Sequence, residues 1–253
     1  MADKVTIGNC ELWHGDCREV LPMLPKHDLL LTDPPYGVGI AAWDARMPVD
    51  WFGDAMAALP KAGAAYIFGD PVELSRFQVY WASYGVQWKA RCVWTYEDGP
   101  RNAKAWTRKH EDCLVWHGSA HKQQTPKEPS IHADPRWGDD RLVGDVWAMP
   151  RVLGNYGERE EHPSQKPVAL MVRVASSDPD AETVLDPFMG SGTTGVACAQ
   201  LGKAFTGIER ERKYFDIACR RIEQAYAQPR LFEDAKVGAG DTAVQVELLP
   251  ANA

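Results

Sequence analysis

The sequence predicts an α/β protein with a doubly wound, mostly parallel sheet, and three observations lead to this fold class. Buried apolar runs alternate with amphipathic segments along most of the chain, as in parallel sheets covered by helices on both faces. The apolar run 28–32 ends abruptly in Asp33-Pro34-Pro35-Tyr36. A second run, 184–186, leads through a glycine turn at 190–192 into a helix, a unit that holds nucleotide-like ligands in such folds.

The other elements follow in chain order. Residues 5–13 are typical of a short strand or hairpin, and Asp16 is well placed to cap a short helix that follows it. Period and composition predict further helices over residues 50–59, 72–84, 167–177, 193–201 and 210–227. They predict further strands over residues 63–69, 87–95, 112–117, 183–185 and 204–208, with 244–249 as a candidate edge strand.

Between Gly118 and Glu161 the regular pattern is lost. This stretch is polar, is interrupted by prolines and glycines, and has no sustained period of two or 3.6 residues. An insertion of this length inside a compact domain is usually functional or disordered. We therefore predict a single domain over residues 1–228 with an insertion at about 118–161, followed by a loosely attached tail over 229–253.

Composition narrows the class of protein. No apolar run approaches the roughly 20 residues of a membrane helix, and the start of the chain lacks a signal-peptide pattern, so we expect a cytoplasmic protein. The six cysteines form no metal-binding spacing, which favours reduced, mostly buried thiols and no metal. The net charge of −7 argues against a protein that coats nucleic acid non-specifically, but a local basic face is compatible with it.

The motif Asp33-Pro34-Pro35-Tyr36 suits chemistry on a planar amino group. The amine of a nucleic-acid base is a poor nucleophile because its lone pair is delocalised into the ring. A carboxylate (Asp33) and a rigidly held carbonyl (Pro34) can each accept one of its hydrogens, and Tyr36 can stack on the base. The alternative interpretation is a strand-terminal turn with a surface tyrosine.

The glycine turn suits a nucleoside cofactor. Asp186 ends the strand, Gly190 and Gly192 allow close backbone approach, and Glu209 ends the next strand at a distance suited to a ribose. A plain helix start is the simpler alternative. Because Gly195 completes a G-x-G-x-x-G pattern, a dehydrogenase is a rival, although it would leave Asp33–Tyr36 unexplained.

A third motif, His162-Pro163-Ser164-Gln165-Lys166-Pro167, precedes a helix and could by itself be an exposed loop. Taken together, D-P-P-Y, H-P-S-Q-K-P, D-P-F-M-G-S-G-T-T and G-I-E resemble the S-adenosylmethionine-dependent DNA amino-methyltransferases, which methylate N6 of adenine or N4 of cytosine. The motif order resembles the circularly permuted β group of that family. Matching segments run from about Gly15 to Arg221.

The resemblance implies a seven-stranded, Rossmann-like methyltransferase fold with S-adenosylmethionine as cofactor. It implies that Asp33, Pro34 and Tyr36, with Pro35 between them, hold a flipped base, and Asp33 favours N6 of adenine over N4 of cytosine. Lys166 would lie near the methionine end of the cofactor and Asp16 near its adenine. The residues implied to bind the cofactor are Asp16, Lys166, Asp186, Pro187, Phe188, Gly190, Ser191, Gly192, Thr193 and Glu209.

By the same resemblance, residues 118–161 occupy the place of a target-recognition region, and their shortness favours a homodimer. Positive charge interleaved with an aromatic ring suggests contacts to double-stranded DNA, although any one of these side chains could belong to a solvated face. The candidates are Arg101, Lys104, Trp106, Arg108, Lys109, Arg136 and Arg141. Two rivals are a methyltransferase acting on RNA or protein, and a DNA-binding module with a decayed site. A restriction endonuclease partner and an orphan or phage enzyme are both compatible with the motifs.

Overall fold

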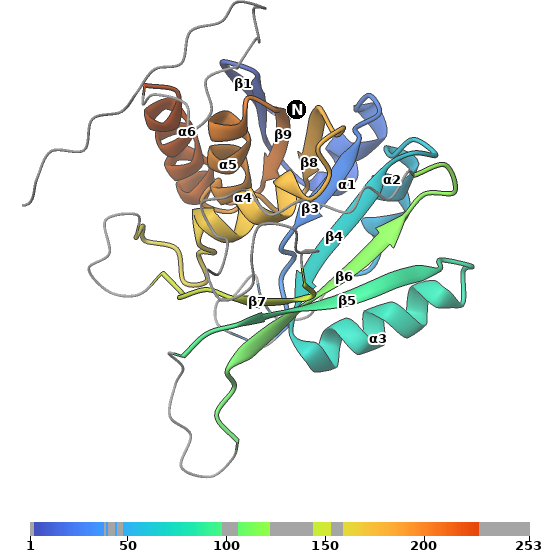
Figure 1. The fold of residues 1–253 in the computed structure, drawn as a ribbon. Helices are drawn as coiled ribbons and strands as arrows, with labels where there is room; N and C mark the ends of the chain where they lie inside the picture. The colour runs from blue at the N-terminus through green and yellow to red at the C-terminus, as the bar shows by residue number, and fades with distance from the viewer. Residues whose placement is uncertain are drawn as a thin grey trace, which may run out of the picture.

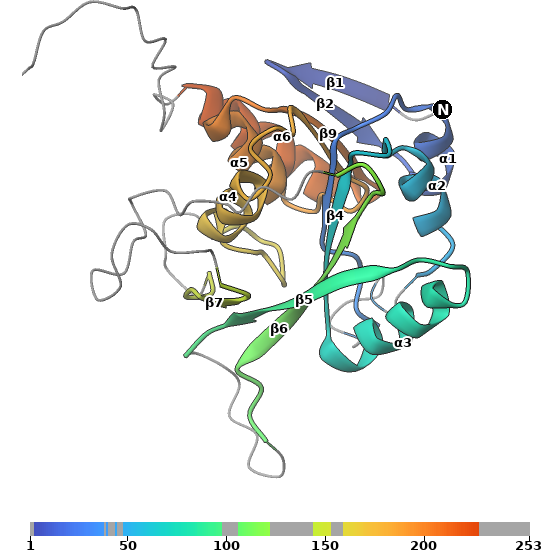
Figure 2. The ribbon, with the colours of Figure 1, turned by 45° about the vertical axis from the view of Figure 1, so that its right-hand side comes forward.

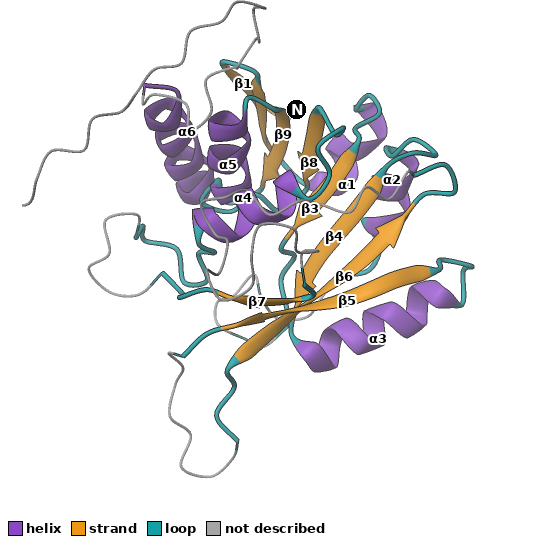
Figure 3. Cartoon of the chain, in the orientation of Figure 1, coloured by secondary structure: helices purple, strands orange, loops and turns teal. Residues whose placement is uncertain are grey.

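The computed structural model describes residues 3–37, 39, 44, 48–97, 106–121, 144–152 and 159–227, and their elements form one mixed sheet flanked by helices (Figure 1, Figure 3). The strands are β1 (Asp3–Ile7), β2 (Cys10–His14), β3 (Leu29–Thr32), β4 (Ala64–Gly69), β5 (Trp88–Thr95), β6 (His110–His117), β7 (Val146–Ala148), β8 (Thr183–Asp186) and β9 (Ala204–Glu209). The helices are α1 (Cys17–Val20), α2 (Phe52–Ala57), α3 (Pro71–Ala82), α4 (Val168–Ser176), α5 (Thr193–Leu201) and α6 (Arg212–Ala227), with a 3₁₀ turn at Leu21–Met23.

The predicted doubly wound α/β fold is confirmed, but the described sheet has nine strands rather than seven. Their order is β1-β2-β9-β8-β3-β4-β6-β5-β7. Neighbours from β2 to β4 are parallel, whereas β6 runs antiparallel to both β4 and β5. The two additional strands lie at the edges: β1 completes an N-terminal hairpin with β2, and β7 pairs with β5.

The strand β7 corrects the expectation that residues 118–161 are without regular structure. Its three residues are too few to show a period, so tertiary pairing rather than local pattern produces the strand. Asp145 accepts a 2.7 Å backbone hydrogen bond from Val93, and Trp147 is buried against Phe68. The tail over 229–253, with its candidate strand 244–249, lies outside the described residues.

Helices cover both faces of the sheet, as Figure 2 shows. On one face α4, α5 and α6 pack their apolar sides on the strands through residues such as Leu170, Val196 and Phe215. On the other face the core contains Val20 from α1, Phe52 from α2 and residues of α3. Five of the six cysteines are buried in these layers. In the part of the chain that is described, no helix is long and apolar enough to span a membrane.

The register of the central strands brings distant motifs together. Leu29 and Leu30 of β3 pair in parallel with Val184 and Leu185 of β8, so both strands end at the same edge of the sheet. Because β6 is antiparallel to β4, its amino end lies at that edge too: Asp112 pairs with Gly69, the last residue of β4. The carboxyl ends of β3 and β8 and the amino end of β6 therefore lie at the same edge of the sheet.

Candidate active site

The glycine turn after β8 is held in place by hydrogen bonds to Asp186, the last residue of that strand. This buried carboxylate accepts hydrogen bonds from the Thr32 hydroxyl (2.7 Å), the Thr194 hydroxyl (2.7 Å) and the backbone N–H of Phe188 (3.1 Å). Desolvation raises the pKa of Asp186 to about 6, against the lowering effect of these hydrogen bonds. Asp186 therefore links β3, β8 and α5.

Glu209, at the end of β9, faces the turn from the other side. Its Oε2 accepts from the backbone N–H of Gly190 at 3.0 Å, and its Oε1 accepts from that of Glu211 at 2.7 Å. Burial raises the pKa of Glu209 to about 7, although these N–H groups act to lower it. Each carboxylate oxygen has further acceptor capacity, so hydroxyl groups of a ligand can donate to it while the turn stays fixed.

Glycine is required at positions 190, 192 and 195 for different structural reasons. Gly190 (φ +52°) lines the site, and a Cβ there would lie 3.0 Å from Nε2 of His162. Gly192 (φ +79°) was expected to line the cofactor pocket as well, but it is not among the described residues around the cavity. Instead it caps α5 and packs against α6, because a Cβ there would lie 2.8 Å from Cβ of Ala218. Gly195 likewise allows α5 to pack closely on Phe205 and Ile222.

Asp16 caps the first helix, as predicted, by accepting from the backbone N–H of Arg18 at 3.0 Å. Its other contacts are with the Arg18 guanidinium, at 2.9 and 2.6 Å. The side-chain hydrogen bonds from Arg18 keep the pKa of Asp16 below its usual value. Asp16 thus brings a fixed negative charge to the wall near Glu209.

The H-P-S-Q-K-P segment is not an exposed loop. His162, Gln165 and Lys166 are buried, and the His162 ring packs edge-on against Tyr214 with 4.5 Å between centroids. Burial lowers the pKa of His162 to about 4, with Lys166 adding to the effect, so this ring is neutral at pH 7. The segment places Lys166 beside Asp33.

Lys166 contacts both Asp33 of the D-P-P-Y motif and Glu111, a residue that none of the sequence motifs predicted. Its Nζ lies 2.6 Å from Oδ2 of Asp33 and 3.1 Å from Oε2 of Glu111, the second residue of β6. The Tyr36 hydroxyl lies 2.5 Å from Oδ1 of Asp33 and 2.8 Å from Oε2 of Glu111. The Lys166 ammonium also lies 5.0 Å from the Tyr36 ring centroid and 5.8 Å from that of Trp94. Lys166 therefore lies against the D-P-P-Y motif.

The ionisation of this cluster follows from burial and pairing. Desolvation raises the pKa of Asp33, while Lys166 partly offsets the rise. Desolvation and the neighbouring carboxylates raise the pKa of Tyr36 well above 10, so it is a neutral phenol that donates. Desolvation favours loss of the Lys166 proton, but Asp33 and Glu111 outweigh it and raise the Lys166 pKa, so the ammonium stays charged.

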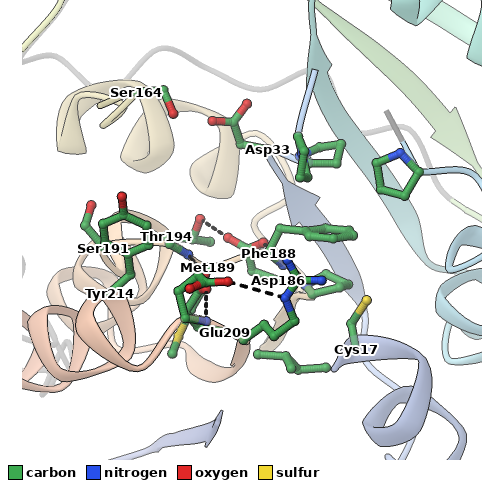
Figure 4. A pocket seen from close by; sticks show the side chains of 18 of the residues that line it. Cys17, Asp33, Ser164, Asp186, Phe188, Met189, Ser191, Thr194, Glu209 and Tyr214 are labelled. Carbon is green, nitrogen blue, oxygen red and sulfur yellow. Dashed lines mark hydrogen bonds and ion pairs between the residues drawn. The ribbon is translucent and has the colours of Figure 1, made fainter. Parts of the chain in front are cut away.

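One cavity of about 430 Å³, within the range of small-molecule sites, is lined by most of these groups. Glu111 is not part of this lining and contacts it through Lys166 and Tyr36. Figure 4 shows Asp33 at one side and Glu209 at the other, with Phe188 and Asp186 between them. The predicted site residues that line it are Asp16, Asp33, Pro34, Pro35, Tyr36, Lys166, Asp186, Pro187, Phe188, Gly190, Ser191, Thr193 and Glu209.

The predicted DNA contacts are only partly within the described residues. Arg101, Lys104, Arg136 and Arg141 lie outside them. Trp106 is 99% exposed and Lys109 is exposed, close to the start of β6 at the edge where the cavity lies. Arg108, in contrast, forms an ion pair with buried Asp70, the cap of α3, so part of its role is structural.

An open α/β sheet whose glycine turn and acidic strand ends face one cavity is the arrangement of the class I methyltransferases. Two solved structures share this fold. One is the M1.HpyAVI–SAM complex, with 27% identity, a TM-score of 0.64, and coverage of 84% of this chain and 99% of that one. The other is the PvuII cytosine-N4-specific DNA methyltransferase, with 15% identity, a TM-score of 0.69, and coverage of 88% and 93%.

More narrowly, the chain belongs to the N6/N4 DNA methylase family, whose model matches residues 27–220. It is 32% identical to the DNA adenine methyltransferase YhdJ of Escherichia coli K12, over 84% of this chain and 82% of that protein. It is 26% identical to the type II methyltransferase M.HpaI of Haemophilus parainfluenzae, over 79% and 69%. The protein is thus an S-adenosylmethionine-dependent DNA methyltransferase.

The residues present fit S-adenosylmethionine. The cavity is large enough, Glu209 keeps free acceptor capacity for ribose hydroxyls, and Phe188 presents a ring to the same space. Asp16 lies near Glu209 on the wall where the resemblance puts the adenine. When bound, the cofactor supplies an electrophilic sulfonium methyl group.

Proposed function

We propose that this protein methylates N6 of an adenine flipped out of double-stranded DNA, and that Asp33, Pro34 and Tyr36 hold the base. The observation that carries the proposal is the placement of Asp33 in the same cavity as Glu209, at the joined ends of β3 and β8. A base inside the duplex cannot present its amino group to so enclosed a carboxylate, so the nucleotide must leave the stack.

The chain's own groups orient the amine. The Asp33 carboxylate and the Pro34 carbonyl accept the two amino hydrogens, and this favours a pyramidal nitrogen with its lone pair directed into the cavity. Because the Tyr36 phenol is neutral and donates toward Asp33, it holds that carboxylate in place. Catalysis by this site is mainly positioning and electrostatic orientation.

Adenine is the preferred target for two reasons. The motif begins with aspartate at position 33, which resembles the adenine enzymes of the family, and YhdJ, 32% identical, is named for adenine. Methylation of cytosine N4 is the runner-up, and RNA or protein are more distant alternatives.

The finer features of the enzyme belong to the same proposal. Residues 118–161 form the target-recognition region of a single domain spanning 1–228, and Trp106, Lys109 and Arg108 lie on the DNA-facing edge. The enzyme acts in the cytoplasm, and two copies act together because this recognition region is short.

Label transfer tests the function directly. The purified protein is incubated with methyl-labelled S-adenosylmethionine and unmethylated duplex DNA, RNA or a protein mixture, and the DNA is digested to nucleosides. We expect label only in N6-methyldeoxyadenosine. Label in N4-methyldeoxycytidine would replace adenine by cytosine as the target, and label only in RNA or protein would overturn the proposal. Methylation-aware sequencing of the product then gives the recognition sequence.

A further inference from the structure

Glu111 lies beside Asp33 and Tyr36, where we propose that the target base binds (the acceptor site), but it belongs to none of the predicted motifs. Its Oε2 faces both donors that also contact Asp33: the Lys166 ammonium at 3.1 Å and the Tyr36 hydroxyl at 2.8 Å. Lys166 is 5% exposed, so its charge is withdrawn from water and depends on these carboxylates. The four side chains form a closed ring of contacts, in which the single hydroxyl hydrogen of Tyr36 can be donated to Asp33 or to Glu111.

In this ring both oxygens of Asp33 are already engaged. Oδ1 is contacted by Tyr36 and Oδ2 by Lys166, each at 2.6 Å or less. An amino group that donates to Asp33 must therefore share or displace one of these donors. A buried ammonium that loses its partner is strongly unfavourable. The donors need a second acceptor within reach if Asp33 is to become available to the base.

We propose that Glu111 is a positioning residue for methyl transfer: it retains Lys166 and Tyr36 when the amino group of the target base takes over Asp33. The inference rests on the proposed function, because it concerns the same acceptor site. Glu111 comes from the start of β6, next to residues paired with β4, so its carboxylate is held on the sheet rather than on a loop. The Lys166 ammonium and the Tyr36 hydroxyl already lie 3.1 and 2.8 Å from its Oε2, so both donors have this acceptor within reach.

The charge of Glu111 should also stabilise the positive charge that develops on the target nitrogen during methyl transfer. With both carboxylates ionised and Lys166 protonated, the cluster carries one net negative charge. In the proposed transfer the target nitrogen would form its bond to the methyl carbon as the carbon–sulfur bond of S-adenosylmethionine breaks and the sulfur leaves as a neutral thioether. The nitrogen would then be cationic until one of its own hydrogens leaves as a proton to solvent. A net negative cluster favours that cation, and neutralising Glu111 would remove this advantage.

The test is the single-turnover rate of DNA methylation by Glu111→Gln, with Asp112→Asn as the matched control. Asp112 is the next residue on the same strand, is 4% exposed, and pairs with Arg91 at 3.0 Å rather than with the cluster. We expect Glu111→Gln to slow methyl transfer by roughly 10- to 100-fold, the size of the loss when a residue that orients a ligand is removed at a metal site. The dissociation constant for S-adenosylmethionine should stay within about twofold of wild type, and Asp112→Asn should keep the wild-type rate.

A double variant distinguishes a positioning role of Glu111, exerted through Lys166, from general damage to the structure. If Glu111 acts in part through Lys166, the loss of rate in the double variant Glu111→Gln/Lys166→Met should be smaller than the product of the two single losses. Glu111→Asp, which keeps the charge on a shorter side chain, should recover part of the rate.

A wild-type rate in Glu111→Gln would overturn the inference. So would independent, multiplicative losses in the double variant, or an equal loss in Asp112→Asn. Failure of the wild-type protein to methylate any nucleic-acid amine would instead refute the proposed function, so the two failures are distinguishable.

Discussion

The hydroxyl of Thr32 donates a 2.7 Å hydrogen bond to Oδ1 of Asp186, and this bond joins the two strands that carry the two halves of the site. Thr32 immediately precedes Asp33, which we propose holds the target base, while Asp186 precedes the glycine turn. Both side chains of the bond are buried. Residues about 150 positions apart in the sequence are therefore held in fixed relation by one charge-assisted contact.

Replacing Thr32 by valine should lower the free energy of unfolding by about 1.5–3 kcal/mol, because the bond goes to a buried carboxylate. Urea denaturation measures the loss. Ser177→Ala is the comparison, since the Ser177 hydroxyl bonds only to the neutral oxygens of Tyr66 and Val174 among its described contacts. It should cost about 1 kcal/mol. Equal losses in the two variants would mean that the charge of Asp186 does not strengthen the Thr32 bond.

Asp33→Ala should abolish most methylation while leaving cofactor binding intact. The loss should reach about 10³-fold in turnover, since the variant lacks an acceptor aimed at the reacting amine. Lys166 and Tyr36 keep Glu111 as a partner, so the fold should persist. Methyl incorporation and calorimetric titration with S-adenosylmethionine measure the two quantities. A parallel loss of cofactor affinity would make Asp33 a structural residue instead.

Cofactor affinity should rise with pH through about 7, because burial raises the pKa of Glu209 from 4.5 to about 7. Below that pH the free enzyme carries a protonated Glu209, which accepts ribose hydroxyls less strongly than a carboxylate does. Binding favours the ionised form and so should release a proton near neutral pH. Titration calorimetry in two buffers of different ionisation enthalpy measures the release.

Glu209→Gln should bind S-adenosylmethionine more weakly and lose this part of the pH dependence. Any change of affinity with pH that remains in the variant then comes from ionisation of the ligand. The same raised pKa affects stability with the opposite sign. Between pH 4.5 and about 7 the unfolded chain has lost this proton and the folded chain has kept it, so the Glu209 contribution to stability falls as pH rises. A wild-type stability curve in this interval that matches that of Glu209→Gln would contradict the assignment.

Gly190→Val should remove cofactor binding. The residue has φ +52°, which valine adopts only with strain, and a Cβ there meets His162. The turn should shift and the N–H bond to Glu209 should be lost. Equilibrium binding of labelled S-adenosylmethionine is the measurement. Adding His162→Ala should relieve the contact but not the backbone strain, so affinity should return only in part; unchanged affinity in Gly190→Val alone would refute the pocket assignment.

Sequence patterns predicted the features that depend on local residue order, such as buried strands, and those that depend on the shared edge of parallel strand ends. The runs before Asp33 and Asp186 indicated buried strands, and carboxyl ends of parallel strands share an edge, so their meeting was predictable. Glu111 was not, because it lies at the amino end of a strand, and only the antiparallel direction of β6 brings that end to the site. The same residue in a parallel strand would lie at the opposite edge.

Packing partners also escaped prediction. Gly192 fits a cofactor motif, yet the neighbour that requires a glycine there is Ala218 on a helix 26 positions later. Arg108 fits a phosphate-contacting pattern, yet its charge meets Asp70 at the start of α3. In both cases the residue type was informative, but its partner depends on how distant helices and strands are placed.

Trp106→Ala should weaken DNA binding without lowering stability. The side chain is 99% exposed, so the folded protein gains nothing from burying it, whereas stacking on a base is worth about 1–3 kcal/mol. Affinity for DNA that contains an unpaired, unstacked base should therefore fall roughly 5- to 150-fold, with an unchanged melting temperature of the protein. Lys109→Ala is the comparison on the same segment: it should weaken binding to all sequences alike and reduce the salt dependence by about one phosphate contact. Arg108→Ala should behave differently again, lowering the melting temperature because Asp70 is left buried without its ion-pair partner. DNA affinity equal to wild type in Trp106→Ala would remove this tryptophan from the DNA-facing edge.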